Sequence, residues 1–258
     1  MTKTLVTGAT GFVGNAFVKQ LLTRYEFGHV AVAVRKNGFQ WPDGVRQHII
    51  GNLDISNDWS NVVEDISVVV HCAARVHLVT DKSENPLDEF RNVNVQGTMN
   101  LARYAATAGV RRFVFVSSIG VNGAETFRQP FDAQDRALPH SPYALSKYEA
   151  ELGLHALATE TGMEVVIIRP PLVYGPGAPG NFGSLMRWLQ RGIPLPLGSI
   201  HNLRSLVALD NLVDLIVTCL THPAAANETF LVSDGEDVST TELLRRMGQA
   251  MGCPARLI

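Results

Sequence analysis

Hydrophobic residues along the chain alternate between short apolar runs and longer stretches with helical spacing. Stretches with apolar side chains at three- and four-residue intervals predict helices at residues 11–24, 87–108 and 142–161. Short apolar runs predict strands at residues 3–7, 30–34, 48–50, 67–71, 112–117 and 164–168. Strands that alternate with long helices form βαβ units, so the pattern predicts an α/β fold with a doubly wound parallel sheet.

The pattern changes after Arg169. Residues 170–196 contain six prolines and five glycines, which interrupt regular elements. Further on, Asp210 is a candidate cap for a helix through Leu220, and a Ser-Thr-Thr-Glu sequence predicts a helix at residues 239–251. We therefore expect a large domain at residues 1–169 and a smaller C-terminal lobe at residues 170–258. The chain stops just past the last predicted helix, so we also expect a truncated C-terminus.

Composition excludes several classes of protein. The chain of 258 residues is 46% hydrophobic with a net charge of −2, which excludes global disorder. Its 22 basic residues are balanced by 24 acidic ones without a dense basic run, so no nucleic-acid partner is expected. Three cysteines are too few for a disulfide framework, and no apolar run is long enough to span a membrane. We expect a soluble cytoplasmic protein with no membrane partner.

A glycine-rich sequence joins the first predicted strand to the first predicted helix. Glycines at 8, 11 and 14 allow a tight turn and a close approach of the backbone to a pyrophosphate. The helix start adds free N–H groups and the positive end of the helix dipole. The sequence therefore predicts a Rossmann-type dinucleotide site with contacts from Gly8, Thr10, Gly11, Phe12, Val13 and Gly14.

The end of the second strand bears on which dinucleotide is bound. A carboxylate at this position usually binds the ribose hydroxyls of NAD, whereas an arginine accommodates the additional phosphate of NADP. Here the strand ends in Val34-Arg35-Lys36. The alternative is that Arg35 and Lys36 are two solvated charges. We expect NADP(H) to be favoured over NAD(H), with Arg35 as a cofactor contact.

Tyr143 and Lys147 are spaced to lie on one face of a predicted helix. A free tyrosine is a poor acid or base, since its ordinary pKa is about 10. A neighbouring ammonium favours the phenolate, so we expect Lys147 to lower the pKa of Tyr143. Ser118, which follows the strand at residues 112–117, can hydrogen-bond the same substrate oxygen. The set predicts acid–base chemistry beside a dinucleotide.

These motifs together resemble the extended short-chain dehydrogenases/reductases, in their nucleotide-sugar epimerase/dehydratase/reductase branch. The resemblance spans essentially the whole chain. Its motifs are Thr-Gly-Ala-Thr-Gly-Phe-Val-Gly from residue 7, Val-Val-His-Cys-Ala-Ala from 69, Asn-Val-Gln-Gly-Thr from 94, Phe-Val-Ser-Ser from 115, Tyr-Ala-Leu-Ser-Lys from 143 and Arg-Pro-Pro-Leu-Val-Tyr-Gly-Pro-Gly from 169.

The resemblance implies roles for further residues. Tyr143 is the implied acid–base, Ser118 its partner on the reacting oxygen, and Lys147 holds the nicotinamide ribose. Asn94 is implied to support Lys147 through water. Asn52 departs from the aspartate that relatives often have beside the adenine. The further implied cofactor contacts are Asn52, Leu53, Ala73, Ala74 and Pro170, with Tyr143 and Lys147.

The resemblance also implies a substrate and an assembly. In the smaller lobe, Asn181 and Arg204 resemble residues that bind the diphosphate of a nucleotide-diphosphate sugar. A guanidinium can contact phosphate oxygens in a bidentate manner. Relatives often pair two long helices per subunit into a dimer interface. We therefore expect a homodimer formed through the helices at residues 87–108 and 142–161.

The residues after Ser118 help to select the reaction. Dehydratases resemble a pattern with an additional acid and base there, but this chain has Ile119 and Gly120, so dehydration is disfavoured. Because Arg35 suggests NADP(H), we expect a reductase that acts at C4 of a UDP-4-keto-6-deoxy sugar. The alternative is a 4-epimerase of UDP-glucose or UDP-N-acetylglucosamine with retained NAD.

Two other classes fit less well. A non-catalytic sensor would be expected to lose part of the Tyr–Lys–Ser set, which this chain keeps. A steroid- or flavonoid-type reductase would be expected to line its second lobe with apolar groups. No metal site is expected, since His71, Cys72 and His77 have no carboxylate cluster beside them.

Overall fold

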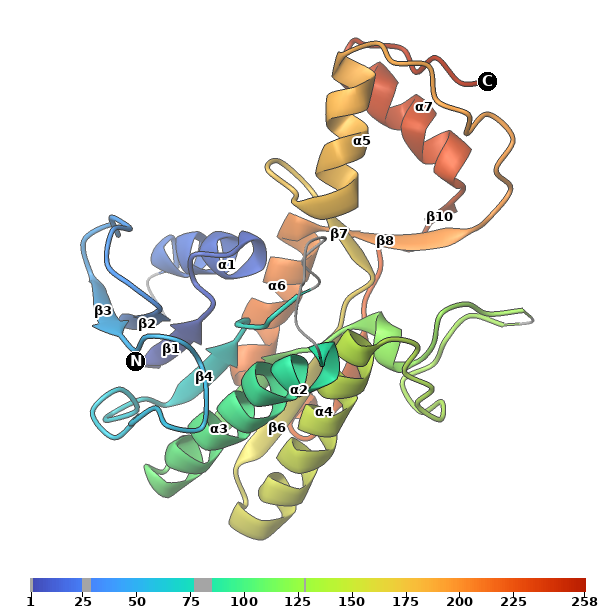
Figure 1. The fold of residues 1–258 in the computed structure, drawn as a ribbon. Helices are drawn as coiled ribbons and strands as arrows, with labels where there is room; N and C mark the ends of the chain where they lie inside the picture. The colour runs from blue at the N-terminus through green and yellow to red at the C-terminus, as the bar shows by residue number, and fades with distance from the viewer. Residues whose placement is uncertain (1, 25–28, 77–84, 128) are drawn as a thin grey trace. The chain divides into compact units, whose positions relative to one another are not determined.

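The structure is a computed structural model that describes residues 2–24, 29–76, 85–127 and 129–258. The chain divides into two compact units (Figure 1). The first combines Met1–Pro170 with Val213–Leu231, and the second combines Pro171–Leu212 with Val232–Ile258. The sequence predicts one boundary, after residue 169, whereas the chain passes between the units after residues 170, 212 and 231. Between residues 213 and 231 the chain therefore returns to the first unit, to which it adds the last part of a helix and one more strand.

Within the residues described, the first unit contains a seven-stranded sheet in the order β3-β2-β1-β4-β5-β6-β9. Every neighbouring pair is parallel, which confirms the doubly wound sheet. The strand order reverses between β1 and β4, where ligands bind at the carboxyl ends of strands in sheets of this type. The strands are β1 (Thr4–Thr7), β2 (Val30–Val34), β3 (Val45–Ile49), β4 (Val68–His71), β5 (Arg112–Val116), β6 (Glu164–Arg169) and β9 (Thr229–Leu231).

Helices cover both faces of this sheet (Figure 1). Helix α1 (Phe12–Leu22) and the part of α6 (Leu209–Thr221) from Val213 onward share one face, where Arg24 Nη2 lies 2.8 Å from Asp214 Oδ1. Helices α3 (Thr98–Thr107) and α4 (Pro142–Thr161) pack together on the other face.

The single helix predicted at residues 87–108 has an internal irregularity. It consists of α2 (Pro86–Phe90), a π-helical segment (Arg91–Gly97) and α3. A π-helical turn contains an additional residue, and such turns occur frequently at functional sites. The ordinary helical spacing of these residues does not predict this segment.

The strands form because their residues are buried on both faces. β1, β2 and β4 are buried at every position, as expected for parallel strands between two helical layers. Towards α3 and α4, strand side chains such as Phe113 and Ile167 join Leu101 and Leu154 in one cluster. Each fully buried side chain of this size contributes about 1.5–3 kcal/mol relative to its exposed state. This core holds the carboxyl ends of the strands in place.

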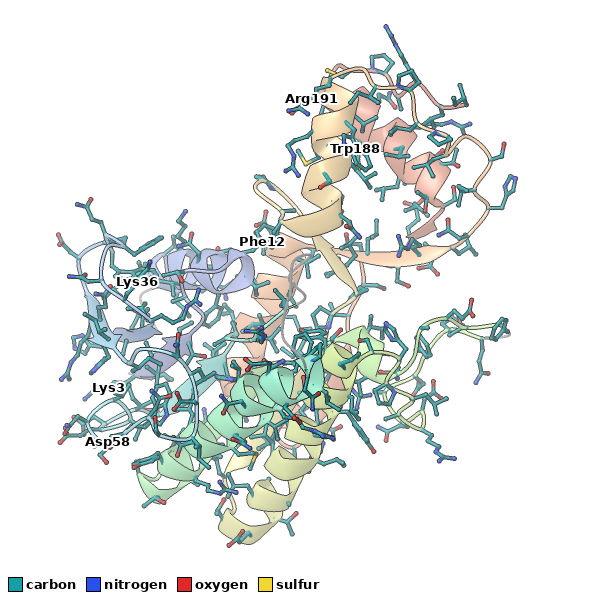
Figure 2. All side chains as sticks on the ribbon, viewed as in Figure 1. Lys3, Phe12, Lys36, Asp58, Trp188 and Arg191 are labelled. Carbon is teal, nitrogen blue, oxygen red and sulfur yellow. The ribbon has the colours of Figure 1, made fainter. Side chains whose placement is uncertain are left out.

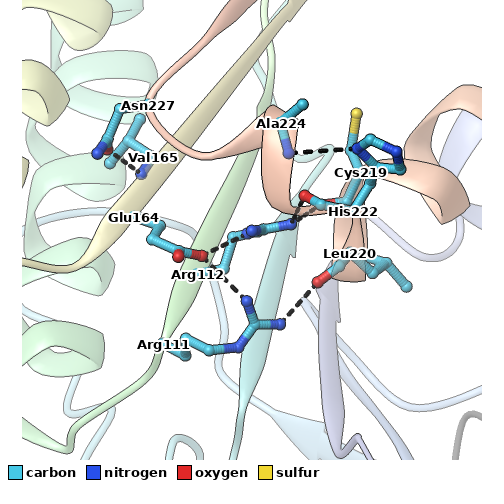
Figure 3. Close-up of polar contacts among 9 residues, drawn as sticks. All are labelled: Arg111, Arg112, Glu164, Val165, Cys219, Leu220, His222, Ala224 and Asn227. Carbon is cyan, nitrogen blue, oxygen red and sulfur yellow. Dashed lines mark hydrogen bonds and ion pairs between the residues drawn. The ribbon is translucent and has the colours of Figure 1, made fainter.

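Two adjacent arginines attach the end of α6 to the start of β5 and β6 (Figure 3). Arg112 is almost completely buried and donates to the carbonyls of Cys219 and His222 at 2.6 and 3.0 Å. Arg111 donates to the carbonyl of Leu220 at 2.8 Å, and both guanidinium groups contact Glu164. Cations at a helix C-terminus satisfy carbonyls that have no partner within the helix. These contacts explain how the returning segment is held in the first unit.

The second unit contains a smaller sheet in the order β10-β8-β7 among the residues described. Its strands are β7 (Leu172–Tyr174), β8 (Arg204–Ala208) and β10 (Asp237–Val238), and its helices are α5 (Gly180–Gln190) and α7 (Thr240–Ala250). Ser239 Oγ accepts from the Glu242 amide at 3.0 Å, which confirms the predicted start of the last helix. Helix α6 begins one residue before the predicted cap, at Leu209.

In the part of the chain that the structure describes, no helix combines the length and the apolar character needed to cross a membrane. The longest, α4, has 20 residues but includes the buried ionisable side chains of Lys147 and Glu151. Its composition fits a helix that packs on a sheet and contributes polar groups to it.

Candidate functional site

The glycine loop follows β1 and leads directly into α1. Gly8 has a φ of +69°, and a Cβ there would lie 2.6 Å from the Ala73 amide nitrogen. A Cβ at Gly14 would lie 2.4 Å from the carbonyl oxygen of Gly8. Side chains at these positions would therefore collide with backbone. The loop is a compact cradle of the kind that a pyrophosphate needs.

The start of α1 is open to an anion. Gly11 is the N-cap residue and no side chain caps the first amides, while Phe12 begins the helix (Figure 2). The first N–H groups of a helix have no intrahelical partner and bind phosphates readily. The loop geometry and this open helix start fit a dinucleotide such as NAD.

The other predicted cofactor contacts follow the carboxyl ends of neighbouring strands. After β2, Arg35 and Lys36 are exposed, and Figure 2 labels Lys36. Leu53 is buried and Asn52 is exposed. After β4, Ala73 and Ala74 are half-buried, and the Ala73 amide donates to Thr7 Oγ1 at 3.4 Å. Pro170 is buried at the end of β6. The arrangement follows the sheet edge at which doubly wound folds bind nucleotides.

Tyr143 and Lys147 lie in the first turns of α4. Ser141 Oγ caps this helix by accepting from the Ala144 amide at 3.2 Å, and Pro142 occupies the first turn, where its missing N–H has no cost. Lys147 is 1% exposed, and its Nζ lies 3.8 Å from the centroid of the Phe115 ring. The lysine is thus removed from water and rests on β5.

Burial determines the protonation of both groups. It lowers the pKa of Lys147 from 10.5 to about 7 and raises the pKa of Tyr143 from 10 to about 12. The pKa of Tyr143 in the protein by itself therefore lies above its ordinary value, and not below it as expected. The reason is that both side chains lose hydration, which disfavours their charged forms.

Ser118 is held in an extended conformation at the end of β5. It caps a short 3₁₀ helix (Ile119–Val121), and its Oγ accepts from the Gly120 amide at 3.1 Å. The Ile119 amide donates to the carbonyl of Pro170 at 3.0 Å, so β6 fixes this turn. Ile119 and Gly120 carry no group that can move a proton, as expected when dehydration is disfavoured.

Asn94 is buried in the π-helical segment. Its side chain accepts from the Arg75 amide at 2.8 Å and donates to the Arg75 carbonyl at 3.0 Å. It also donates to Ser146 Oγ at 3.0 Å, and Ser146 precedes Lys147 in α4. The structure thus links Asn94 to the chain after β4 and to the helix of the lysine. Its implied role beside Lys147 remains a prediction.

His71 is a neutral side chain between two hydroxyl groups. Its Nδ1 lies 2.7 Å from Thr7 Oγ1 and its Nε2 lies 2.9 Å from Thr98 Oγ1. Burial, with a smaller contribution from Lys147, lowers the pKa of His71 to about 3. Both ring nitrogens therefore have protein partners. His77, the other histidine considered for a metal, lies outside the described residues.

The decisive comparison is with a family of enzymes. The sequence model of the NAD dependent epimerase/dehydratase family matches residues 4–233. The chain belongs to this family. The predicted resemblance is confirmed, and the protein is an enzyme of the extended short-chain dehydrogenase/reductase type.

Several members of the family are similar along most of the chain. A UDP-glucose 4-epimerase of Vibrio cholerae is 50% identical over 252 residues, which cover 97% of this chain and 76% of that protein. The solved structure of MoeE5 in complex with UDP-glucose and NAD is 26% identical with a TM-score of 0.84, and covers 99% of this chain and 84% of its own. DesIV, a dTDP-glucose 4,6-dehydratase of Streptomyces venezuelae with NAD and TYD bound, is 27% identical with a TM-score of 0.83 over 100% of this chain and 84% of its own.

These family members bear on two expectations. The preference for NADP(H) over NAD(H) finds no support, because both solved relatives hold NAD. The reductase interpretation is supported less well than its alternative, because the Vibrio cholerae relative is an epimerase. The exposed Arg35 is compatible with a solvated charge after the strand. A basic residue at this position is therefore insufficient to identify the cofactor.

The two residues expected to bind a diphosphate lie in the second unit. Asn181 is exposed in the first turn of α5, and Arg204 is exposed at the start of β8. Within this unit, Asp234 accepts from Tyr174, from the Ala208 amide and from Asn211, at 2.7–3.1 Å. This carboxylate joins β7 to the start of α6. The role of Asn181 and Arg204 in binding remains a prediction.

Sequence reasoning missed a buried ionic network in the first unit. Glu151, one turn after Lys147 in α4, pairs with Arg169 at the end of β6, where Arg169 Nη2 lies 2.6 Å from Glu151 Oε2. Ser117 donates to the same carboxylate, and Arg169 donates to Asn122 at 2.9 Å. The signal in the sequence is the four-residue spacing between Lys147 and Glu151, which places a carboxylate on the face of the helix that carries the lysine.

Proposed function

We propose that the protein is an NAD-dependent 4-epimerase of a UDP-sugar, with UDP-glucose as the first substrate to test. The observation that carries this proposal is the 50% identity to the Vibrio cholerae UDP-glucose 4-epimerase over 97% of the chain. Ser118, Tyr143 and Lys147 support it, because they lie after β5 and in α4 of one compact unit. Ile119 and Gly120 after Ser118 argue against a dehydratase.

Tyr143 acts as the acid–base in this proposal. It accepts the proton of the C4 hydroxyl as the C4–H bond breaks, and returns that proton when the bond forms again on the other face of the sugar. NAD, held by the glycine loop and Lys147, would supply the hydride acceptor and donor at C4. Ser118 donates a hydrogen bond to the reacting oxygen and so positions it for Tyr143. Such a positioned proton transfer contributes about a hundredfold to ten-thousandfold.

Lys147 compensates for the burial of Tyr143. Because burial raises the pKa of Tyr143 to about 12, the phenolate needs a nearby positive charge. The ammonium of Lys147 supplies this charge and also binds the nicotinamide ribose. The glycine loop, Leu53 and the Ala73–Ala74 segment bind the rest of the dinucleotide. In the second unit, Asn181 and Arg204 bind the diphosphate of the substrate.

The experiment that tests the proposal compares epimerisation with reduction. The purified protein is incubated with NAD and UDP-glucose, and UDP-galactose is measured by chromatography. UDP-galactose in large excess over the enzyme, with no accumulation of NADH, supports the epimerase. UDP-N-acetylglucosamine is tested in parallel. Stoichiometric oxidation of NADPH with a UDP-4-keto-6-deoxy sugar, and no epimer from either UDP-sugar, would overturn the proposal in favour of a reductase.

We also propose that the protein is a homodimer formed through residues 87–108, which include α3, and through α4. The two helices pack side by side, and Leu152 in α4 is an exposed apolar side chain with an exposed fraction of 52%. A Leu152→Glu substitution is expected to shift the mass measured by light scattering from dimer to monomer. A wild-type protein that is monomeric at micromolar concentration would contradict this part of the proposal.

A further inference from the structure

The network around Glu151 and Arg169 lies directly beside the proposed site. Glu151 is 1% exposed and Arg169 is 6% exposed. Arg169 Nη2 lies 2.6 Å from Glu151 Oε2, and its Nε lies 3.1 and 3.2 Å from the two carboxylate oxygens. The pair is therefore a bidentate, charge-assisted contact in the protein interior.

This pair links the residues on either side of Ser118 to helix α4. Ser117, which precedes Ser118, donates its hydroxyl proton to Glu151 Oε1. Arg169 Nη1 donates to Asn122 Oδ1 at 2.9 Å, which fixes the turn that follows Ser118. Glu151 itself belongs to α4, the helix of Tyr143 and Lys147. One ion pair thus sets the position of the serine relative to that helix.

Among the groups around Lys147, Glu151 supplies a negative charge that favours the protonated lysine. On β4, His71 is neutral, and burial raises the pKa of the neighbouring Cys72 thiol to about 12, so it is uncharged near neutral pH. On β5, Lys147 faces the ring of Phe115, and on α4 it shares a face with Tyr143. Glu151 opposes the loss of the proton that burial favours, and its own partner on β6 is Arg169.

We propose that Glu151 and Arg169 are positioning residues of the site, which hold Ser118 against α4 and place the Glu151 carboxylate one turn from Lys147 on the same helix face, where it favours the ammonium form. This inference rests on the proposed roles of Tyr143, Ser118 and Lys147, but not on which sugar is bound. Neither residue of the pair needs to contact substrate. Arg169 orients the carboxylate, and the carboxylate connects Ser117 to α4, the helix that carries Lys147.

A contribution to folding stability is not enough to explain why this ion pair is buried here. Taking two charges out of water costs so much that a buried ion pair contributes little more than well-packed apolar side chains of the same size. A purely structural role would also predict the same behaviour for the other arginine–glutamate contact of these strands, Arg112 with Glu164. That contact provides a matched control, because its arginine is bound to carbonyls at the end of α6.

The first test measures the protonation of Lys147 directly. The chain has five lysines, so a protein labelled with ¹³C at the lysine ε carbon gives few signals, and a Lys147→Arg variant identifies the relevant one. We expect Glu151→Gln to move the titration midpoint of Lys147 down by about 1 pH unit or more. Glu151→Asp keeps the charge, so its Lys147 midpoint should stay close to the wild-type value. Glu164→Gln should leave the Lys147 midpoint unchanged. An unchanged midpoint in Glu151→Gln, or an equal shift in Glu164→Gln, overturns the proposal.

The second test separates position from charge. Ser117→Ala removes the link to Ser118 without changing charge, so it is expected to lower kcat about tenfold with little change in KM and in the Lys147 midpoint. Glu164→Gln keeps kcat. If Glu151→Gln does not fold, the neutral double variant Glu151→Gln/Arg169→Gln replaces it in the lysine titration of the first test. Wild-type kcat and KM in Ser117→Ala would overturn the positioning role.

The two proposals can fail separately. A wild-type protein that does not epimerise any UDP-sugar refutes the proposed function, while the lysine titration still decides whether Glu151 favours the ammonium form of Lys147. Conversely, a fully active Glu151→Gln variant with an unchanged Lys147 midpoint refutes the positioning role and leaves the epimerase proposal intact.

Discussion

Strand β6 has an arginine–glutamate contact at each end, and the two contacts serve different purposes. At the amino end, Glu164 accepts from Arg112 Nε at 2.7 Å, and the guanidinium satisfies carbonyls at the end of α6. At the carboxyl end, Arg169 binds Glu151 and donates to Asn122 in the turn after Ser118, while Ser117 donates to Glu151. Similar side chains thus hold a helix end in one place and the proposed catalytic residues in the other. Position along the sheet decides the role, because doubly wound sheets bind ligands at their carboxyl ends.

The largest effect is expected from the proposed acid–base at the carboxyl end. Tyr143→Phe removes the phenol and keeps the ring that packs against Phe90. We expect kcat for UDP-glucose epimerisation to fall about a hundredfold to ten-thousandfold, because no proton transfer remains. The melting temperature and NAD binding should stay close to wild type. A Tyr143→Phe variant with more than a tenth of wild-type kcat would remove Tyr143 from the mechanism.

The next largest effect compares the two arginines by stability. Arg169→Met leaves the carboxylate of Glu151 buried without its partner, which is expected to cost about 3–5 kcal/mol of unfolding free energy. Arg112→Met leaves carbonyls without a donor. Glu164 still pairs with Arg111, and its side chain is 30% exposed, so a loss of about 1–3 kcal/mol of unfolding free energy is expected. Urea unfolding measures both variants. Equal losses would show that the two ends are energetically alike.

The sequence predicted the first unit better than the second. Apolar runs such as residues 67–71 identify buried strands by themselves, since parallel strands are apolar on both faces. In the second unit, α5 and β7 lie among prolines and glycines, which predict loops. Such short elements depend on tertiary contacts, so the local sequence does not identify them. The π-helical segment around Asn94 has no distinguishing local pattern.

The ionic network was missed for a related reason. Glu151 and Arg169 are separated by 18 residues and meet only because α4 packs on β6. Likewise, the spacing of Tyr143 and Lys147 predicts that they share a helix face but not how far each is removed from water. Burial, which only the fold determines, reversed the expected direction of the tyrosine pKa shift.

Glycine substitutions give a further comparison between the site and a distant turn. Gly8→Ala places a Cβ 2.6 Å from the Ala73 amide, whereas Gly109, with a φ of +77°, has no atom within 4 Å of the same addition. Both variants carry strain of about 1–2 kcal/mol from the left-handed backbone. We expect only Gly8→Ala to weaken NAD binding, by at least about tenfold. Calorimetric titration with NAD checks this, and equal affinities in the two variants would contradict the cradle.

The burial of Lys147 predicts a pH dependence of stability. Its pKa is about 7 in the folded protein and 10.5 when exposed, so between these values the unfolded chain binds more protons. Unfolding free energy should therefore rise as pH rises from about 7 to 10.5, by at most about 1.4 kcal/mol per unit. Lys147→Met should remove this rise, and Lys19→Met, at an exposed position of α1, should keep it. The comparison uses urea unfolding at several pH values.

The smallest effect is expected at the edge of the cofactor site. Arg35 is exposed after β2, and the solved relatives hold NAD, which lacks the phosphate that an arginine would bind. Arg35→Ala should therefore change the NAD dissociation constant less than about threefold, as is usual for a solvated surface charge. A selective loss of NADP(H) binding in Arg35→Ala, with NADP(H) bound more tightly than NAD(H) by the wild type, would instead show that this arginine binds a phosphate. The residue after β2 would then determine the choice between NAD and NADP in this chain, as the sequence alone predicts.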